Sequence, residues 1–226
     1  MDKNKQITLS FMADRSYFIS EAFKSLRTNI LFCGSDIRCI AVTSVLPGDG
    51  KSTVSLDIAK SFSDTGKNVL FVDADMRKSV NAVRHKISGS FPGLSEFLSG
   101  QACFTDIITE TQTPFLNMVV SGMFPPDPVE LLGNNRFSEF IDKCRRIYDY
   151  IIIDTPPLGA VIDAAVVAPR CDGVIVVIPE GKISSKLAVS VKDQLEKSNC
   201  RILGAVMNFA KSGNDSYKHY YSSKNP

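Results

Sequence analysis

The chain has 226 residues, of which 44% are hydrophobic and 22% are charged, the proportions of an ordinary globular protein rather than of a disordered chain. The 26 lysines and arginines nearly balance the 24 aspartates and glutamates, which argues against a general nucleic-acid binder. No apolar run approaches the roughly 20 residues that a membrane-spanning helix needs, so we expect a cytoplasmic protein.

Short apolar segments alternate with amphipathic ones. The first amphipathic segment predicts a helix with four inward-facing side chains: Ala22, Phe23, Leu26 and Ile30. Strands are predicted at residues 39–43, 68–72, 116–120, 150–153, 173–178 and 201–206, with further helices around residues 54–62, 137–144 and 187–195. Because these strands are continuous in Val, Ile and Leu, we expect an α/β fold: a doubly wound, mainly parallel sheet flanked by helices.

Two segments lack periodicity. Residues 79–92 are expected to form a mobile loop, and residues 211–226 are rich in Ser, Lys, Asn and Tyr. We therefore predict a domain over residues 1–210 and a flexible tyrosine-rich tail over residues 211–226. Parallel sheets bind ligands at the carboxyl ends of their strands, so the segments directly after the strands are where a site is expected.

A glycine-rich segment follows the first strand and runs directly into a helical pattern. It contains Pro47, Gly48, Asp49, Gly50, Lys51, Ser52 and Thr53. Its glycines would let backbone N–H groups converge on phosphate oxygens, while Lys51 would reach the β- and γ-phosphates and Ser52 would bind Mg²⁺. The sequence predicts a phosphate-binding loop, although Val45 stands where the general pattern has glycine. The alternative is a glycine-rich turn that binds nothing.

Polar side chains also follow three later strands. Asp73 and Asp75 come after residues 68–72, and Asp154 comes after residues 150–153. Such carboxylates could hold Mg²⁺ or accept a proton from an attacking hydroxyl, whereas a helix cap or solvated turn is the alternative for the first two. Asn208, after the last strand, could recognise a base edge through its amide or be satisfied by backbone.

The tail contains three of the six tyrosines, Tyr217, Tyr220 and Tyr221, where no core requires them. They are candidate phosphorylation sites, each of which would gain a charge of about −1.5 to −2. The alternative is that they dock as aromatic side chains on a neighbouring molecule.

The Pro-Gly-Asp-Gly-Lys-Ser loop, the Asp-x-Asp-x-Arg and Ile-Ile-Ile-Asp-Thr-Pro-Pro strand ends and the tyrosine tail together resemble a bacterial tyrosine kinase of capsular and exopolysaccharide systems. The resemblance implies a phosphate-loop NTPase fold and an ATP- and Mg²⁺-dependent autokinase that phosphorylates the tail of a neighbouring copy. It implies control of polysaccharide synthesis and export. By this resemblance, the nucleotide is bound by Lys51, Ser52 and Thr53. Asp75 and Asp154 hold the metal and Asp73 is the base, although Asp73 and Asp75 could exchange roles.

The resemblance also implies partners. Glu21, Lys24 and Arg27 match the family's Glu-x-x-Arg-x-x-Arg helix, which mediates contacts in a ring, with Lys24 replacing the middle arginine. A separate transmembrane adaptor would recruit the kinase to the inner face of the plasma membrane, and a cognate phosphotyrosine phosphatase would oppose it.

Two functions other than a tyrosine kinase are also compatible with a phosphate-binding loop. A switch ATPase of the septum-positioning or plasmid-partition type shares the fold, but such proteins usually carry a second lysine where this chain has Leu46. The other is a module in which ATP only stabilises a ring.

Overall fold

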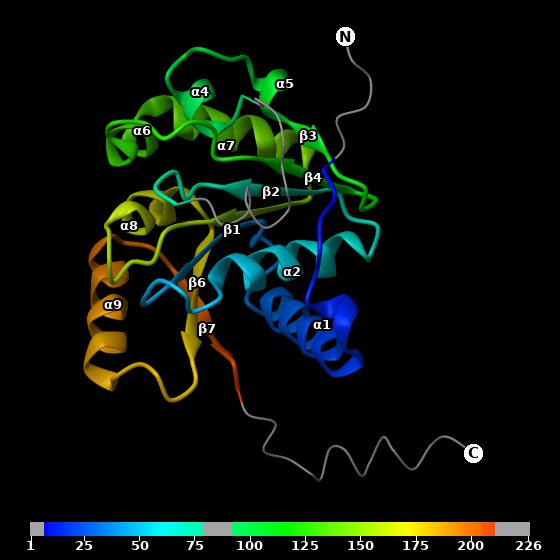
Figure 1. Cartoon of the computed structure of the whole chain (residues 1–226), viewed down its shortest axis with the longest axis vertical. Coiled ribbons are helices and arrows are strands. Elements are labelled where there is room, and N and C mark those ends of the chain that lie inside the picture. Colours follow the sequence, from blue (N-terminus) through cyan, green and yellow to red (C-terminus); the bar gives the residue numbers. More distant parts are fainter. Residues whose placement is uncertain (1–6, 79–91, 211–226) are drawn as a thin grey trace.

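The structure, a computed structural model, describes residues 7–78 and 92–210 (Figure 1). Within them lies a seven-stranded sheet in the order β3-β4-β2-β5-β1-β6-β7. The strands are β1 (Cys39–Ser44), β2 (Val69–Asp73), β3 (Thr109–Glu110), β4 (Leu116–Val119), β5 (Tyr150–Asp154), β6 (Gly173–Pro179) and β7 (Ile202–Asn208). All pairings are parallel except that of β3 with β4, so the predicted mainly parallel sheet is confirmed. The two-residue β3, too short for a periodic pattern, was not predicted.

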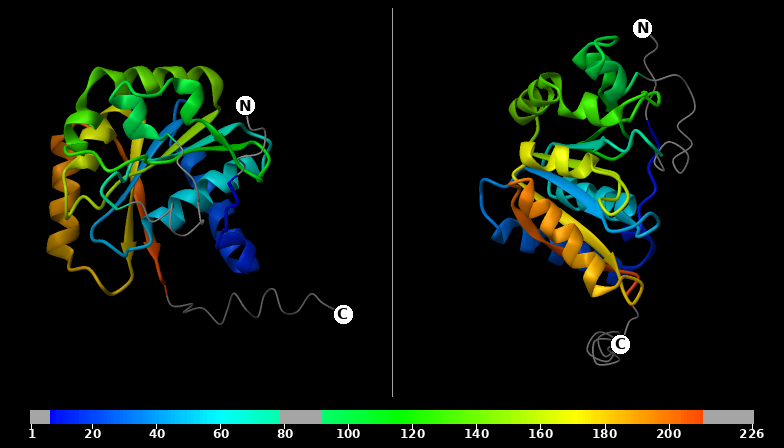
Figure 2. Two further views of the ribbon diagram at one scale, coloured as in Figure 1. Left: turned by 45° about the horizontal axis from the view of Figure 1, so that its top comes forward. Right: turned by 90° about the vertical axis from the view of Figure 1, so that its left-hand side faces the viewer.

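Helices cover both faces of the sheet (Figure 2). One face carries α1 (Tyr17–Phe32) and α2 (Lys51–Ser63). The other carries α4 (Leu94–Leu98), α5 (Phe104–Ile107), α6 (Pro128–Gly133), α7 (Asn135–Ile147), α8 (Asp163–Val167) and α9 (Ser185–Lys197). Two 3-10 helices span Ala13–Arg15 and Ala168–Arg170.

The strands are apolar throughout because each face of the sheet has its own core. Ile40 and Val42 of β1 pack toward α1 and α2, whereas Cys39 and Ala41 pack into the opposite layer. All four side chains are fully buried, and each fully buried aliphatic side chain contributes about 1.5–3 kcal/mol. The strands are continuously apolar in the sequence because their side chains are buried on both faces of the sheet.

Helix α1 packs on α2 along a narrow stripe. Ile30 is buried and Phe23 and Leu26 are half-buried, as predicted. The prediction was wrong for Ala22, which is exposed, because a helix that covers another helix buries only the residues on its contact line.

The segment before α1 is fastened across the same face. The backbone N–H of Ile7 donates to Glu110 at 3.1 Å. Farther along, the N–H groups of Met12 and Ala13 donate to the buried carboxylate of Asp57 in α2, at 3.1 and 3.0 Å. This segment is therefore part of the folded domain.

The parallel strands end at one edge of the sheet, with β1 between β5 and β6. That order brings the segments after β1, β2 and β5 together. Residues 79–91 of the loop predicted at residues 79–92, and the tail with Tyr217, Tyr220 and Tyr221, lie outside the described residues. Among the residues that are described, no helix has both the length and the apolar character needed to cross a bilayer.

Candidate active site

The loop after β1 turns tightly into the first turn of α2. Gly48 and Gly50 both have φ of +87°, in the left-handed region that favours glycine. A Cβ atom on Gly50 would also collide with the amide nitrogen of Asn208. The loop is braced from within, because the carboxylate of Asp49 accepts a hydrogen bond from the N–H of Leu46 at 2.7 Å. Since α2 begins at Lys51, the N–H groups of its first turn lie where the loop closes.

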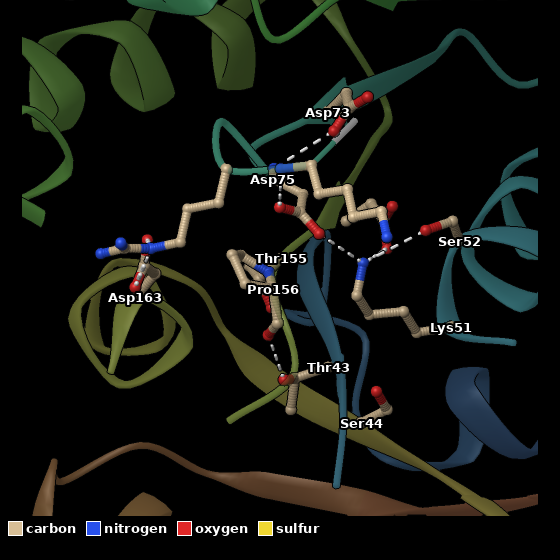
Figure 3. A network of polar contacts seen from close by, with 12 residues as sticks. Thr43, Ser44, Lys51, Ser52, Asp73, Asp75, Thr155, Pro156 and Asp163 are labelled. Atoms are coloured by element: carbon tan, nitrogen blue, oxygen red, sulfur yellow. Dashed lines mark hydrogen bonds and ion pairs between the residues drawn. The ribbon is translucent and has the colours of Figure 1, made fainter. Parts of the chain in front are cut away.

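Lys51, in the first turn of α2, is surrounded by acidic side chains from the ends of β2 and β5 (Figure 3). Its Nζ atom lies 3.0 Å from Oδ2 of Asp75 and 3.6 Å from Oδ1 of Asp154, and it donates to Oγ of Ser52 at 3.2 Å. Burial alone would lower the pKa of Lys51, but the charges of Asp154, Asp75 and Asp73 outweigh it and raise the pKa above its ordinary value. The lysine is therefore charged throughout the physiological pH range.

The three aspartates come from two neighbouring strands. Asp73 of β2 and Asp154 of β5 are paired in register. Oδ1 of Asp73 accepts a hydrogen bond from the backbone N–H of Asp75 at 3.1 Å, and Oδ1 of Asp75 accepts one from the backbone N–H of Lys78 at 3.0 Å. These bonds turn the chain after β2, so that Asp75 faces Lys51. The structure thus brings Asp73, Asp75 and Asp154 together beside the loop.

Asn208, at the end of β7, contacts the same loop. Its Nδ2 donates to the backbone carbonyl of Asp49 at 2.8 Å, which fits the alternative that backbone satisfies this amide. Phe209 follows with φ of +55°, and Nζ of Lys182 lies 5.0 Å from the centre of its ring. The end of β7 is therefore tied to the phosphate-binding loop.

Sequence reasoning missed Asp163, the first residue of α8. Nε of Arg77 lies 3.0 and 3.2 Å from the two carboxylate oxygens of Asp163, which is fully buried (Figure 3). The pair fixes the segment that carries Asp75 against α8. Its two members are 86 residues apart, so no local pattern could have revealed the pairing.

The three residues predicted for subunit contacts lie on α1, and two of them pair with each other. Nζ of Lys24 lies 2.7 Å from Oε1 of Glu21 on the surface. The guanidinium of Arg27 instead donates to the carbonyl and hydroxyl oxygens of Ser61 in α2. Arg27 therefore fastens α1 to α2 within the chain.

The site fits a nucleotide with Mg²⁺. The carboxylates of Asp75 and Asp154 and the hydroxyl of Ser52 are oxygen ligands of the kind that this cation prefers. No group of three or more His, Cys, Asp or Glu side chains in residues 7–78 and 92–210 could hold a metal ion alone. Mg²⁺ is usually held by one or two carboxylates together with phosphates, so the two aspartates suffice.

Comparison with known proteins agrees with this geometry. The sequence profile of the family described as AAA domain matches residues 37–202. Tyrosine-protein kinase CpsD of Streptococcus agalactiae is 42% identical over 200 residues, which cover 88% of this chain and 87% of that protein.

Among solved structures, the kinase domain of Escherichia coli tyrosine kinase ETK has a TM-score of 0.84 at 28% identity, covering 94% of this chain and 86% of that one. The septum site-determining protein MinD of Pyrococcus horikoshii has a TM-score of 0.66 at 24% identity, covering 78% and 72%, a likeness of fold alone. The resemblance drawn from the motifs is therefore confirmed: the chain belongs to the bacterial tyrosine-protein kinases, built on the phosphate-loop NTPase fold.

Proposed function

We propose that this chain is an ATP-dependent tyrosine autokinase that phosphorylates Tyr217, Tyr220 and Tyr221 of another copy, and so regulates capsular or exopolysaccharide synthesis and export. The observation that carries the proposal is the convergence of Lys51, Asp75 and Asp154, at 3.0 and 3.6 Å, beside a loop shaped for phosphate. Family membership supplies the type of reaction, and the three tyrosines near the C-terminus supply acceptors.

Each residue of the site has a role in this reaction. Bound Mg²⁺-ATP supplies the phosphoryl group and the cation that offsets its charge. Pro47, Gly48, Asp49 and Gly50 shape the loop, and Asn208 braces it at the nucleotide site through its hydrogen bond to Asp49. Lys51 and the N–H groups of Ser52 and Thr53 hold the phosphates. Ser52, Asp75 and Asp154 hold the cation.

We assign Asp73 as the base. Asp75 and Asp154 face Lys51 directly, on the side where phosphates bind, which suits them to the cation. Asp73 stands next to them, hydrogen-bonded to the N–H of Asp75 at 3.1 Å. It accepts the tyrosine proton as the bond between the tyrosine oxygen and the γ-phosphorus forms. The bond from that phosphorus to the bridging oxygen breaks and ADP leaves.

We propose three partners. Copies assemble in a ring through Glu21, Lys24 and Arg27, a transmembrane adaptor recruits the kinase to the inner face of the plasma membrane, and a phosphotyrosine phosphatase reverses the reaction. Exposed aromatic residues on α1 support assembly, since Phe18 is 54% and Phe32 is 82% exposed. Lysine lacks the bidentate fork of arginine, so the contact through Lys24 is weaker than an arginine contact.

The deciding experiment is a phosphotyrosine assay with Mg²⁺-ATP, with and without the cytoplasmic segments of candidate adaptors. Sites are mapped by mass spectrometry. We expect phosphate on the tail tyrosines of the unsubstituted chain and none in Lys51→Met. ATP hydrolysis without phosphotyrosine, even with a cognate adaptor, would instead indicate a switch ATPase.

A further inference from the structure

Tyr17 is the one tyrosine with a mostly exposed side chain in the part of the chain that the structure describes, at 60% exposure. Tyr148 is only 6% exposed, and its hydroxyl accepts a hydrogen bond from a side chain of β4 at 3.0 Å. The ring of Tyr150 stacks on that of Phe62, with 4.0 Å between the ring centres. Within the folded domain, Tyr17 therefore carries the tyrosine hydroxyl that another protein can reach most readily.

Tyr17 begins helix α1, where the backbone is held by few bonds. Ser16 before it is extended, with φ of −159° and ψ of 133°, and its side chain makes no hydrogen bond to the first turn. The first N–H groups of a helix have no partner within the helix, so a first turn without such a cap frays readily. A phosphoryl acceptor must come within about 3–3.5 Å of the phosphorus, and a fraying turn can move there more easily than a helix interior.

The sequence around Tyr17 resembles that around a tyrosine of the tail. Serine directly precedes both Tyr17 and Tyr217. An aspartate lies three residues before the first, at Asp14, and two residues before the second, at Asp215. An active site that accepts Tyr217 would therefore meet the same small residue and a nearby carboxylate at Tyr17.

We infer that Tyr17 is a further phosphate acceptor, modified by another copy of the kinase; this inference rests on the proposed autokinase function. The phenol oxygen of Tyr17 in one copy forms a bond to the γ-phosphorus of ATP held by another copy. Its proton passes to Asp73 of the catalysing copy, the bond from the phosphorus to the bridging oxygen breaks, and ADP leaves. The product is a phosphotyrosine on the folded domain, separate from those of the tail.

The position of Tyr17 requires a second copy. On one side of it, Asp14 lies 3.5 Å from the ammonium of Lys60, near the end of α2 (Figure 1). On the other side, the carbonyl of Phe23 accepts a hydrogen bond from the residue after Lys60 at 3.3 Å. Lys51 begins the same helix nine residues earlier, a rise of about 14 Å. Tyr17 is thus held beside the end of α2 that lies farther from the phosphates, and another copy must supply the active site.

Phosphorylation of Tyr17 would change the charge of the helix face proposed for contacts between copies. Tyr17, Glu21 and Lys24 are spaced four and three residues apart, so they lie along one face of α1. Glu21 raises the pKa of Lys24 through a hydrogen bond and its charge, and the side chain of Tyr17 adds to that rise, so the tyrosine lies within electrostatic reach of the lysine. A phosphate adds a charge of about −1.5 to −2 beside this neutral pair. The face would then be negative.

Phosphate transfer between full-length chains tests the inference. In the catalyst, four tyrosines are replaced by Phe: Tyr17, Tyr217, Tyr220 and Tyr221. The acceptor is Lys51→Met with only the three tail tyrosines replaced by Phe, which leaves Tyr17 as its exposed acceptor. The matched control is the same acceptor with Tyr17→Phe, a change that removes one hydroxyl group.

The two acceptors are incubated with catalyst and Mg²⁺-ATP, with and without the cytoplasmic segments of candidate adaptors. We expect at least ten times more phosphotyrosine on the acceptor that keeps Tyr17 than on its control, and mass spectrometry should locate the phosphate at Tyr17. Phosphate on Tyr148 or Tyr150 in its place would overturn the inference, because exposure would then not decide which tyrosine is modified.

A third acceptor separates this inference from the proposed function. It is Lys51→Met with its tail intact and Tyr17→Phe. If this tail takes up phosphate while the acceptor that keeps Tyr17 gains no more than its control, Tyr17 is not a site and the autokinase function stands. If no acceptor takes up phosphate, even with a cognate adaptor, the proposed function is wrong, and so is the assignment of Tyr17 that rests on it.

Discussion

The ammonium of Lys51, at the start of α2, lies 3.0 Å from a carboxylate oxygen of Asp75, in the segment that follows β2. The second acid, Asp154, lies 3.6 Å away and is fully buried. A bound phosphate must share the lysine with these carboxylates. The chemistry of the site therefore depends on acids that lie beside a phosphate-binding group.

Replacing Asp73 with Asn should lower the kcat for tyrosine phosphorylation by about 10²–10⁴, the usual contribution of a general base, with ATP affinity nearly unchanged. Asn has the same shape and still accepts the hydrogen bond from Asp75, but it cannot take a proton. Single-turnover phosphorylation and nucleotide titration measure the two effects. If Asp75→Asn instead shows the pure kcat loss while Asp73→Asn loses Mg²⁺ dependence, the two residues have the opposite roles.

Gly50→Ala should weaken nucleotide binding far more than Gly48→Ala. Both glycines have φ of +87°, so each alanine costs about 1–2 kcal/mol of backbone strain. Only the Cβ at position 50 meets Asn208, whereas the Cβ at position 48 meets nothing within 4 Å. Nucleotide titration and urea unfolding of the two variants would show the difference. Equal affinities would mean that the contact of Asn208 with the loop is irrelevant to binding.

The pair of Arg77 and Asp163 should couple α8 to the active site. Arg77→Ala leaves a buried carboxylate without its guanidinium and is expected to cost about 1–3 kcal/mol in the free energy of unfolding, with a rise in the KM for Mg²⁺-ATP. The double variant, Arg77→Ala with Asp163→Asn, should lose less free energy of unfolding than the sum of the losses in the two single variants, because each substitution removes the same contact. Strict additivity in urea unfolding would contradict the coupling.

Asp57 should make stability depend on pH. Burial raises the pKa of Asp57 to about 6 against an ordinary 3.8, although hydrogen bonds from Ala13 and Met12 and the charge of Lys60 act against the rise, and the charge of Asp14 adds to it. The folded state therefore binds the proton more tightly, so this contribution is present at low pH and is lost as pH rises through 6. Relative to Asp57→Asn, the unsubstituted chain should lose about 1 kcal/mol between pH 5 and pH 7.5. Urea unfolding at both values measures it, and a parallel response in the two proteins would contradict the assignment.

Much of the fold was predictable because its signals are local. Apolar runs such as residues 150–153 record burial on both faces of the sheet, and the phosphate-binding loop is contiguous from Pro47 to Thr53. The aspartates could be expected at one edge because parallel strands all end there.

The remaining features depend on contacts between distant segments. Arg77 meets Asp163, Arg27 meets Ser61, and Asp57 meets the backbone of Met12, and none of these pairs leaves a pattern in the sequence. The short antiparallel β3 follows from pairing with β4 rather than from its own two residues.

The net charge of the cluster formed by Lys51 and its three neighbouring aspartates also affects the form in which the nucleotide binds. With Lys51 charged, Asp73, Asp75 and Asp154 leave the cluster with two uncompensated negative charges when all three are ionised. A nucleotide without its cation would draw the lysine away and add anionic oxygens to this excess. A divalent cation supplies the two missing positive charges. The cation thus offsets the negative excess of the cluster, which repels free nucleotide more strongly than the metal-bound form, and free nucleotide should be a poor competitor of the metal-bound form.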